Sequence, residues 1–315
     1  MAGMDLRPII KEVGRGAHGA RALPADAARQ LFGALLDGEV GELELGALLM
    51  AYRIKGETED ELRGFAQALA ARTERLQLPP ASKEGNAVLP VLLPSYNGAR
   101  KLPNLTPLLA LLLARRGVPV LVHGISAGYG RTTTEAIFQA MNIAPASNLA
   151  EAATQLAERR LSYVPLSLLS PGLDRLLAAR ERIGLRGSGH TVAKLLDPFA
   201  GRSVLTVPVT HPDYIELMRS YLKNAAATAL LFRGHEGEPA AGPKRPLEAD
   251  VFVAGGHVRL ETGRPPDIAL PEAIDAATTA RWTEDALAGR VPVPATLVSL
   301  ADWCEAASRG QLPQS

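Results

Sequence analysis

The chain has 315 residues, of which 47% are hydrophobic, so it can bury a large core and form one large or two smaller domains. A net charge of +1 excludes a global basic field, so any role in nucleic-acid binding would need a local patch. The 4% of aromatic residues disfavours a domain that reads single strands by many stacked bases. The single Cys304 excludes an internal disulfide and a Cys-rich metal site, and no apolar run reaches the length of a membrane span. We expect a cytoplasmic protein without a membrane partner.

The N-terminal quarter is predicted to be entirely helical. Residues 24–37 and 41–55 repeat apolar side chains at helical spacing, and each stretch is followed by a glycine. Thr58 and Glu61 form a capping box, which predicts a helix that continues through Leu76. The apolar stripes of the first two helices are wide for so small a domain, so part of that surface is expected to meet a second subunit.

A domain boundary is predicted at Pro79–Pro80 and the polar segment SKEGN, and beyond it strand and helix patterns alternate. The predicted strands are 87–93, 118–122, 161–164, 203–209 and 227–232, and the helices between them are 105–116, 133–142, 149–160, 172–183 and 212–224. Continuous apolar strands separated by helices imply a buried, mostly parallel sheet.

A late hairpin is predicted over residues 250–261, turning at Gly255–Gly256, and the tail is again helical. The fold class is therefore α/β. We predict a small N-terminal helical domain over residues 1–80, with a helix at about 171–187 packing back onto it, and a larger α/β domain over 81–315.

The loop after the first predicted strand carries the strongest indication of a ligand site. A strand that leads through a loop into a helix is where many folds bind phosphate, usually with several glycines in the loop. The loop SYNGARKLPN has only Gly98, and Arg100 and Lys101 follow it. This pattern predicts an anion site that is not built to cradle a pyrophosphate with backbone N–H groups.

A second basic loop follows the next strand. Arg100, Lys101 and Arg131 lie at the carboxyl ends of adjacent predicted strands, where the loops of an open sheet form the ligand site. Tyr96 and Tyr129 lie on the same two loops, where they could stack on bases. The alternative interpretation is solvated loop charges with packing tyrosines.

The helix that begins at Pro171 carries a row of arginines. Arg175, Arg182 and, if the helix extends so far, Arg186 fall on one stripe, which is a candidate phosphate-contacting face. Arg180 falls among apolar residues, so it either pairs structurally or faces an anionic ligand.

Other candidates have equally simple structural explanations. His190 and Lys194 share a helical face and either line the ligand site or form an ordinary surface pair. His123 ends a buried strand, where a hydrogen bond to the backbone would also explain it. Cys304 is expected to pack in a helix rather than to react.

The only metal candidates by residue type are His235, Glu236 and Glu238. They lie in a Gly/Pro-rich loop without a regular element to present them, so we predict that they are solvent-exposed and that no metal binds.

Several segments taken together resemble one known family. They are RIKGETEDELRGF, VLVHG, SPGLDRLLAARERIGLR and HTVAKLLDPF, in that order over nearly the whole chain. This arrangement is similar to the anthranilate phosphoribosyltransferase fold, glycosyltransferase family 3, which is shared with pyrimidine nucleoside phosphorylases. The resemblance implies a His-Gly pair at His123 and Gly124, an anthranilate-holding arginine at Arg180, and a homodimer formed through the helical domain.

The chain departs from those enzymes where they bind substrate. SYNGARKLPN replaces their Gly-Thr-Gly-Gly-Asp loop, ISAGYGRTTTE replaces the Asn-Arg and Lys-Ser loop after His-Gly, and HEGEP has altered acidic spacing. These departures resemble the YbiB-type group, DNA-binding relatives that have a similar SYNGARK-x-PNL segment and a similar HTxAKL segment.

The resemblance implies a homodimer that binds DNA or RNA with little sequence preference, without a cofactor and without anthranilate phosphoribosyltransferase activity. The alternative is an enzyme that transfers a phosphoribosyl or pentosyl group to an aromatic amine or base, which would use magnesium. The candidate nucleic-acid or anion-binding residues are Tyr96, Asn97, Gly98, Arg100, Lys101, His123, Gly124, Tyr129, Arg131, Arg175, Arg180, Arg182, Arg186, His190 and Lys194.

Overall fold

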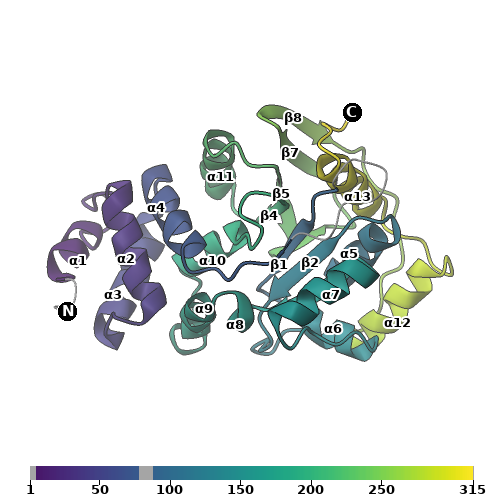
Figure 1. Cartoon of the computed structure of the whole chain (residues 1–315), viewed down its shortest axis with the longest axis horizontal. Helices are drawn as coiled ribbons and strands as arrows, with labels where there is room; N and C mark the ends of the chain where they lie inside the picture. Colours follow the sequence, from purple (N-terminus) through teal and green to yellow (C-terminus); the bar gives the residue numbers. More distant parts are fainter. Residues whose placement is uncertain (1–4, 78–87, 315) are drawn as a thin grey trace. The chain divides into compact units, whose positions relative to one another are not determined.

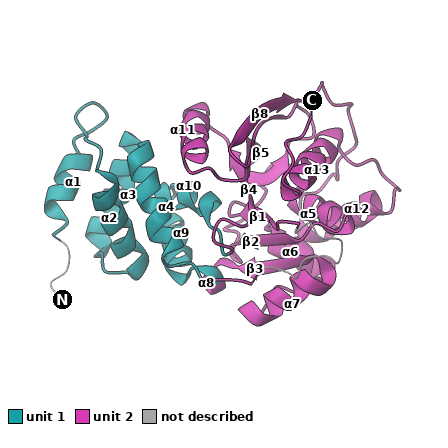
Figure 2. Cartoon of the chain, turned by 45° about the horizontal axis from the view of Figure 1, so that its top comes forward, with its two compact units in different colours: residues 1–74, 169–198 teal, residues 75–168, 199–315 magenta. Residues whose placement is uncertain are grey.

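The computed structural model describes residues 5–77 and 88–314. The chain divides into two compact units, a helical one that comprises the described residues up to Glu74 together with Leu169–Pro198, and an α/β one that comprises the described part of Arg75–Leu168 together with Phe199–Ser315 (Figure 2). The predicted boundary at Pro79–Pro80 and SKEGN lies outside the described residues.

The helical unit gathers helices from two separate parts of the chain. Its α-helices are α1 (Arg7–Val13), α2 (Ala25–Asp37), α3 (Glu42–Lys55), α4 (Glu59–Ala70), α9 (Pro171–Ile183) and α10 (Ser188–Val192), and a 3-10 turn, η1 (Ala193–Leu195), continues α10. The helix α2 packs against both α4 and α9. The buried side chains of α2 include Leu31, Phe32 and Leu36, so this helix supplies much of the core of the unit.

The capping box between α3 and α4 is confirmed, and its glutamate does more than cap. Glu61 is fully buried, and its carboxylate accepts hydrogen bonds from the backbone N–H of Thr58 at 2.9 Å, from the Tyr52 hydroxyl at 3.1 Å and from the backbone N–H of Leu23 at 3.0 Å. Lys55 Nζ lies 2.5 Å from the same carboxylate. The segment RIKGETEDELRGF therefore joins α3 to α4 through one buried, fully partnered carboxylate.

The helix α4 is shorter than predicted. It ends at Ala70 rather than continuing through Leu76. The backbone N–H of Glu74 donates to the carbonyl of Leu169 at 2.8 Å, whereas in a continued helix it would donate to the carbonyl of Ala70.

The α/β unit is built on one mixed sheet. The described strands are β1 (Val91–Ser95), β2 (Val120–Gly124), β3 (Leu161–Pro165), β4 (Val204–Val209), β5 (Ala229–His235), β6 (Glu238–Ala241), β7 (Glu248–Val253) and β8 (Gly256–Glu261). They run in the order β3-β2-β1-β4-β5-β7-β8, and β6 also pairs with β5. Pairing is parallel from β3 to β5 and antiparallel beyond β5, so the predicted mostly parallel sheet is confirmed.

Helices cover this sheet (Figure 1). They are α5 (Thr106–Arg115), α6 (Thr134–Ala140), α7 (Leu149–Arg159), α8 (Leu166–Leu169), α11 (Pro212–Asn224), α12 (Ala276–Leu287) and α13 (Ala295–Ser308). The helix α13 packs against α5, α7 packs on β3, and α11 packs on β5. One apolar core of this unit combines α5, α12 and α13 with the central strands and includes Cys304, which is buried as predicted.

Three details of the strands differ from the sequence prediction. Strands β1 and β2 lie later in the chain than the predicted 87–93 and 118–122. Strand β6 was not predicted, and the hairpin turns one residue early, because Val253 pairs with Gly256 and leaves Ala254 and Gly255 in the turn. Both turn residues have positive φ, of 50° and 80°, which is the conformation that a tight two-residue hairpin requires.

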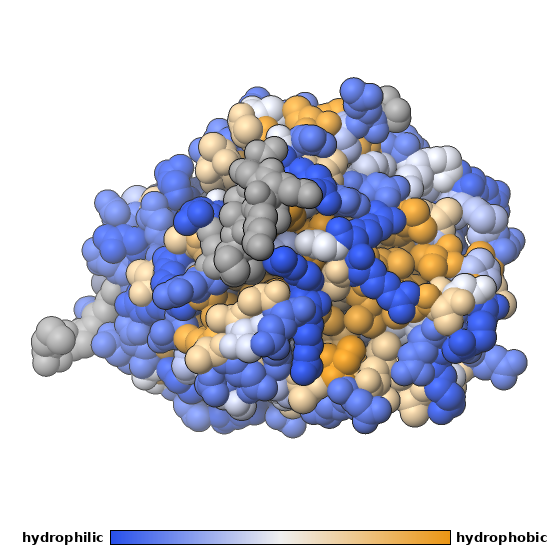
Figure 3. All heavy atoms as spheres, turned by 45° about the vertical axis from the view of Figure 1, so that its right-hand side comes forward, coloured by the Kyte–Doolittle hydropathy of each residue, from blue (hydrophilic) through white to orange (hydrophobic). Residues whose placement is uncertain are grey.

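Among the described residues, no helix is long and apolar enough to cross a membrane. The face drawn in Figure 3 is mostly hydrophilic, with hydrophobic side chains gathered in patches between the polar ones.

Candidate functional site

The two basic loops begin side by side at one edge of the sheet. Strands β1 and β2 are parallel neighbours with Ser95 opposite Gly124, and an antiparallel bridge then joins Ala99 to Thr132 through two hydrogen bonds of 2.9 Å. Gly98 has a φ of +66°, and a Cβ there would lie 2.9 Å from the Cβ of Arg131. A side chain at this position would be strained and crowded, which explains the one glycine of the loop.

Glu238 holds the first half of the loop after β1. Its carboxylate accepts hydrogen bonds from the backbone N–H groups of Asn97 and Gly98, each at 2.8 Å, and from the Ser95 hydroxyl. The side chain is 1% exposed. Burial raises the pKa of Glu238, and the hydrogen bonds from Ser95, Asn97 and Gly98 act in the opposite direction.

Glu236 holds the second half of the same loop. Its carboxylate accepts hydrogen bonds from the backbone N–H of Arg100 at 2.6 Å and from that of Lys101 at 3.1 Å. Partial burial favours the protonated form, but these two hydrogen bonds together with the charges of His235 and Arg131 outweigh it and lower the pKa of Glu236. The predicted solvent exposure is wrong for Glu238, which is buried, while His235 and Glu236 are half-buried. The reason is that a loop more than 130 residues earlier folds its backbone over the two carboxylates.

The backbone N–H groups of this loop are therefore satisfied from within the chain. Successive N–H groups in a strand-to-helix loop form the usual nest for a phosphate, and here two carboxylates fill it. Glu236 and Glu238 are also the metal candidates that the sequence offers by residue type, and their oxygens already accept hydrogen bonds from the loop. Within the described residues, no group of three or more His, Cys, Asp or Glu side chains could hold a metal ion. The residues present do not fit a magnesium–pyrophosphate group.

The side chains of the loop have a different environment from its backbone. Arg100 and Lys101 are exposed, and no described residue hydrogen bonds or ion-pairs with either side chain. Arg131 is half-buried, and its guanidinium donates to the carbonyl of Gly98 at 3.4 Å. Tyr129 is 37% exposed on the second loop. The loops thus present exposed cations, and the backbone N–H groups from Asn97 to Lys101 are occupied.

Three other sequence candidates of this region have internal roles. Tyr96 is buried, and its hydroxyl contacts Nδ1 of His123, so the predicted stacking of Tyr96 on a ligand is wrong for this conformation. Burial lowers the pKa of His123 to about 3, and its Nε2 has no hydrogen-bond partner among the described residues. Asn97 donates its side-chain N–H to the carbonyl of Gly237 at 2.9 Å.

Gly124 has a steric role. A Cβ at this position would lie 2.0 Å from the carbonyl oxygen of Ser95. The glycine therefore allows the close approach of β1 and β2 just where the two basic loops begin.

In the helical unit, the predicted arginine stripe has internal partners. Arg175 donates to the carbonyl of Leu36 at 2.9 Å, and Arg182 pairs with Glu42 at 2.7 Å. The helix α9 ends at Ile183, followed by Gly184 in the left-handed conformation, so Arg186 lies outside the helix and the stripe does not extend to it.

A second basic cluster lies near the end of α9. Burial lowers the pKa of His190 to about 3, and the charges of Arg180, Arg186 and Lys194 lower it further. Burial also lowers the pKa of Lys194 to about 8, together with the charge of Arg186, and Glu57 acts against this shift. These four residues therefore form one electrostatically coupled group, which the sequence had indicated only as separate candidates.

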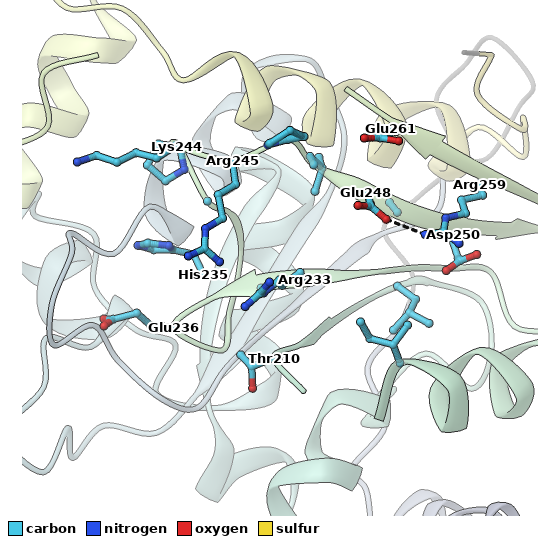
Figure 4. A pocket seen from close by; sticks show the side chains of 18 of the residues that line it. Thr210, Arg233, His235, Glu236, Lys244, Arg245, Glu248, Asp250, Arg259 and Glu261 are labelled. Atoms are coloured by element: carbon cyan, nitrogen blue, oxygen red, sulfur yellow. Dashed lines mark hydrogen bonds and ion pairs between the residues drawn. The ribbon is translucent and has the colours of Figure 1, made fainter. Parts of the chain in front are cut away.

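A cavity of about 700 Å³ lies in the α/β unit, at a place where no sequence pattern predicted a site. It lies beside β5, the segment 242–247, the β7–β8 hairpin and α11 (Figure 4). Its charged lining residues include Arg233, Lys244, Arg245, Glu248 and Glu261. No local motif could have revealed it, because its lining residues lie between Leu102 and Glu261 in the sequence and meet only in the folded sheet.

Known proteins that resemble this chain show its family. Residues 7–73 match the helical bundle domain of the glycosyl transferase family. The chain is 44% identical over 299 residues, 93% of this chain and 91% of the relative, to the uncharacterized protein YbiB of Escherichia coli (strain K12). The chain belongs to the YbiB family.

More distant relatives include enzymes. The anthranilate phosphoribosyltransferase of Methylocella silvestris is 25% identical over 269 residues, which cover 85% of this chain and 73% of that protein. The crystal structure of anthranilate phosphoribosyltransferase from Thermus thermophilus superposes with a TM-score of 0.73 at 22% identity, covering 97% of this chain and 90% of that one.

The enzyme from Saccharomyces cerevisiae in complex with PRPP and Mg superposes with a TM-score of 0.72 at 12% identity, covering 97% of this chain and 89% of that one. The two superpositions show the fold alone. This member of the YbiB family has the anthranilate phosphoribosyltransferase fold.

Proposed function

We propose that this protein binds nucleic acid, DNA in the first place, with little sequence preference and without anthranilate phosphoribosyltransferase activity. One observation carries the proposal. Glu236 and Glu238 occupy the loop N–H groups that would cradle a pyrophosphate, and the cationic side chains of the same loop remain exposed.

The occupied loop argues against phosphoribosyl transfer. A pyrophosphate could enter this nest only by displacing two carboxylates, one of which is fully buried. If the carboxylates stayed in place, their negative charge would repel the pyrophosphate. Transfer of a phosphoribosyl group also requires a divalent cation on the leaving pyrophosphate, and the acids available here are engaged.

The exposed side chains argue for a polyanion. Arg100 and Lys101 carry long, unpaired cationic groups on neighbouring residues, Arg131 lies on the adjoining loop, and Tyr129 is half-exposed beside it. Lys and Arg bind nucleic-acid phosphates without reading sequence, and a tyrosine can stack on any base. Because the net charge of the chain is +1, binding would depend on these local contacts.

Titration of the full chain with single-stranded and double-stranded DNA, at several salt concentrations, tests the proposal. We expect saturable binding that weakens with salt, and weaker, less salt-dependent binding by the double variant Arg100→Ala/Lys101→Ala. The matched control is Arg281→Ala/Arg290→Ala, which removes two exposed positive charges on and just after α12.

A parallel assay supplies phosphoribosyl pyrophosphate, magnesium and anthranilate. Turnover in the ordinary enzymatic range of about 1–1000 per second would overturn the proposal and favour the transferase. Unchanged DNA binding by the Arg100/Lys101 variant would refute the placement of the site.

We further propose that the protein is a homodimer that uses the outer face of α3. The apolar stripe of α2 is buried within its own unit, but Leu43, Met50 and Ile54 of α3 are 82%, 38% and 56% exposed. Their spacing places them on one face of the helix, where they would form a continuous apolar strip. Light scattering at micromolar concentration should give a dimer mass, and Leu43→Glu/Ile54→Glu should give a folded monomer. A monomer mass for the unmodified chain would contradict this proposal.

A further inference from the structure

The cavity beside β5 has an unusual distribution of charge (Figure 4). At one end, Arg219 pairs with Asp250 at 2.8 Å and Arg259 pairs with Glu248 at 2.7 Å, so the cations are neutralised. At the other end are Arg233, Lys244 and Arg245, all exposed, and no described residue hydrogen bonds or ion-pairs with their side chains.

One of these unpaired cations reaches a group that also lacks a partner. Figure 4 shows Arg245 reaching toward the His235 ring, with Lys244 on one side and Arg233 below. His235 Nε2 is buried and has no hydrogen-bond partner among the described residues. Glu236, the carboxylate beside this end, is engaged with the N–H groups of Arg100 and Lys101. Clustered like charges repel one another, the one carboxylate of Glu236 does not balance three cations, and a bound anion reduces that repulsion.

The rest of the cavity suits an organic group attached to the anion. A volume of about 700 Å³ lies in the usual range for small-molecule sites and is far larger than a phosphate needs. Ile215, Leu231 and Leu247 supply apolar lining. Glu261 lies opposite Glu248 in the β7–β8 ladder, and since Arg259 pairs with Glu248, the Glu261 carboxylate remains available to accept from hydroxyl or amino groups.

We propose that this cavity binds a nucleoside monophosphate unit, with its phosphate held by Arg233, Lys244, Arg245 and His235. The sugar and base lie along the apolar wall, and their hydrogen-bond donors face Glu261. Arg is suited to phosphate because its planar fork donates two parallel hydrogen bonds. The unit has two possible sources, a free nucleotide or the phosphorylated end of a strand. The proposal does not rest on the nucleic-acid function of Arg100 and Lys101, because its phosphate-binding residues are different.

Isothermal titration of the full chain tests it with four kinds of probe. These are nucleoside monophosphates, the corresponding nucleosides, inorganic phosphate, and dinucleotides with and without a 5′-phosphate. Phosphorylated probes should bind at least tenfold more tightly than their unphosphorylated partners, and inorganic phosphate should compete with them. Tighter binding of free monophosphates identifies a free nucleotide as the source, and tighter binding of the 5′-phosphorylated dinucleotide identifies a strand end.

Two outcomes in the unmodified chain overturn the proposal without any variant. One is the absence of saturable binding by every phosphorylated probe. The other is equal affinity for inorganic phosphate and nucleotides, which would make the cavity a simple anion site.

Variants then locate the site. Arg233→Ala/Arg245→Ala should lower nucleotide affinity at least tenfold, and the matched control Arg281→Ala/Arg290→Ala should leave it unchanged. Both Arg233 and Arg245 are exposed and their side chains make no hydrogen bond or ion pair with a described residue, so the fold should survive, and circular dichroism with a thermal melt verifies folding. Equal loss in both double variants would overturn the assignment to this cavity.

Discussion

The loop after β1 and the helix α9 carry similar rows of basic residues, and the structure gives them opposite roles. In the loop, acidic side chains bind the backbone and the cations of Arg100 and Lys101 remain unpaired. On α9, the cations themselves are engaged, since Arg175 donates to a helix-end carbonyl and Arg182 pairs with Glu42. A basic residue is therefore informative about a ligand only when its structural partners are known.

The carboxylate of Glu238 should matter most for stability. Glu238→Ala would leave the buried N–H groups of Asn97 and Gly98 and the hydroxyl of Ser95 without their acceptor. Each unsatisfied buried group costs about 1–3 kcal/mol, so we expect a loss of about 3 kcal/mol in the free energy of unfolding. For a unit of this size that corresponds to a melting temperature lower by roughly 6–12 °C. Glu248→Ala, which removes an exposed carboxylate, is the control. A shift below about 2 °C would show that the loop does not depend on Glu238.

Removing the loop cations should have the next largest effect, on binding. Arg100→Ala/Lys101→Ala should lower the salt slope of DNA binding by roughly 1.4–1.8, since each lost phosphate contact contributes about 0.7–0.9. Affinity should fall on the order of tenfold at low salt and by about the same factor for unrelated sequences. Fluorescence anisotropy from about 50 to 200 mM salt measures both quantities. A large dependence on DNA sequence would contradict the assignment of these residues to phosphate contacts.

Proton uptake tests whether the cluster at the end of α9 also meets the ligand. The pKa of Lys194 is lowered to about 8, so near that pH the amine is about half protonated. A nearby phosphate favours the charged amine and raises the pKa of Lys194. At a pH of about 8, binding should therefore be accompanied by the uptake of at most about half a proton, and it should tighten as the pH falls from about 9 to 7. Calorimetry in buffers of different ionisation enthalpy measures the uptake. Lys194→Met should abolish it, and binding without proton uptake would exclude this cluster from the interface.

The smallest effect is expected on the arginine stripe of α9. Arg175→Ala should cost about 0.5–1.5 kcal/mol of stability through the lost hydrogen bond to Leu36. Arg182→Ala should leave the melting temperature unchanged, because its ion pair with Glu42 is exposed to solvent. Neither variant should change the salt slope of DNA binding. A slope change as large as that of the loop variant would place the stripe in the interface and erase the contrast between the two regions.

Much of the fold could be predicted from local sequence, and the site only in part. Most helices and strands, the capping box at Thr58 and Glu61, and the late hairpin follow from short-range patterns, since hydrophobic period and capping chemistry act within a few residues. The same patterns place the two basic loops next to each other, because each loop follows one of the strands β1 and β2, which are parallel neighbours in the sheet.

The features that only the tertiary structure decided are contacts between residues that lie far apart in the chain. The sequence alone determined that the loop after β1 has one glycine and two cations. It did not show that Glu236 and Glu238 bind that loop, because those hydrogen bonds span more than 130 residues. The burial of Tyr96, the early end of α4, the engagement of Arg175 and Arg182, and the cavity beside β5 were undetermined for the same reason. Local patterns specify which elements form, and the partners of a polar group are set by which elements the folded chain brings together.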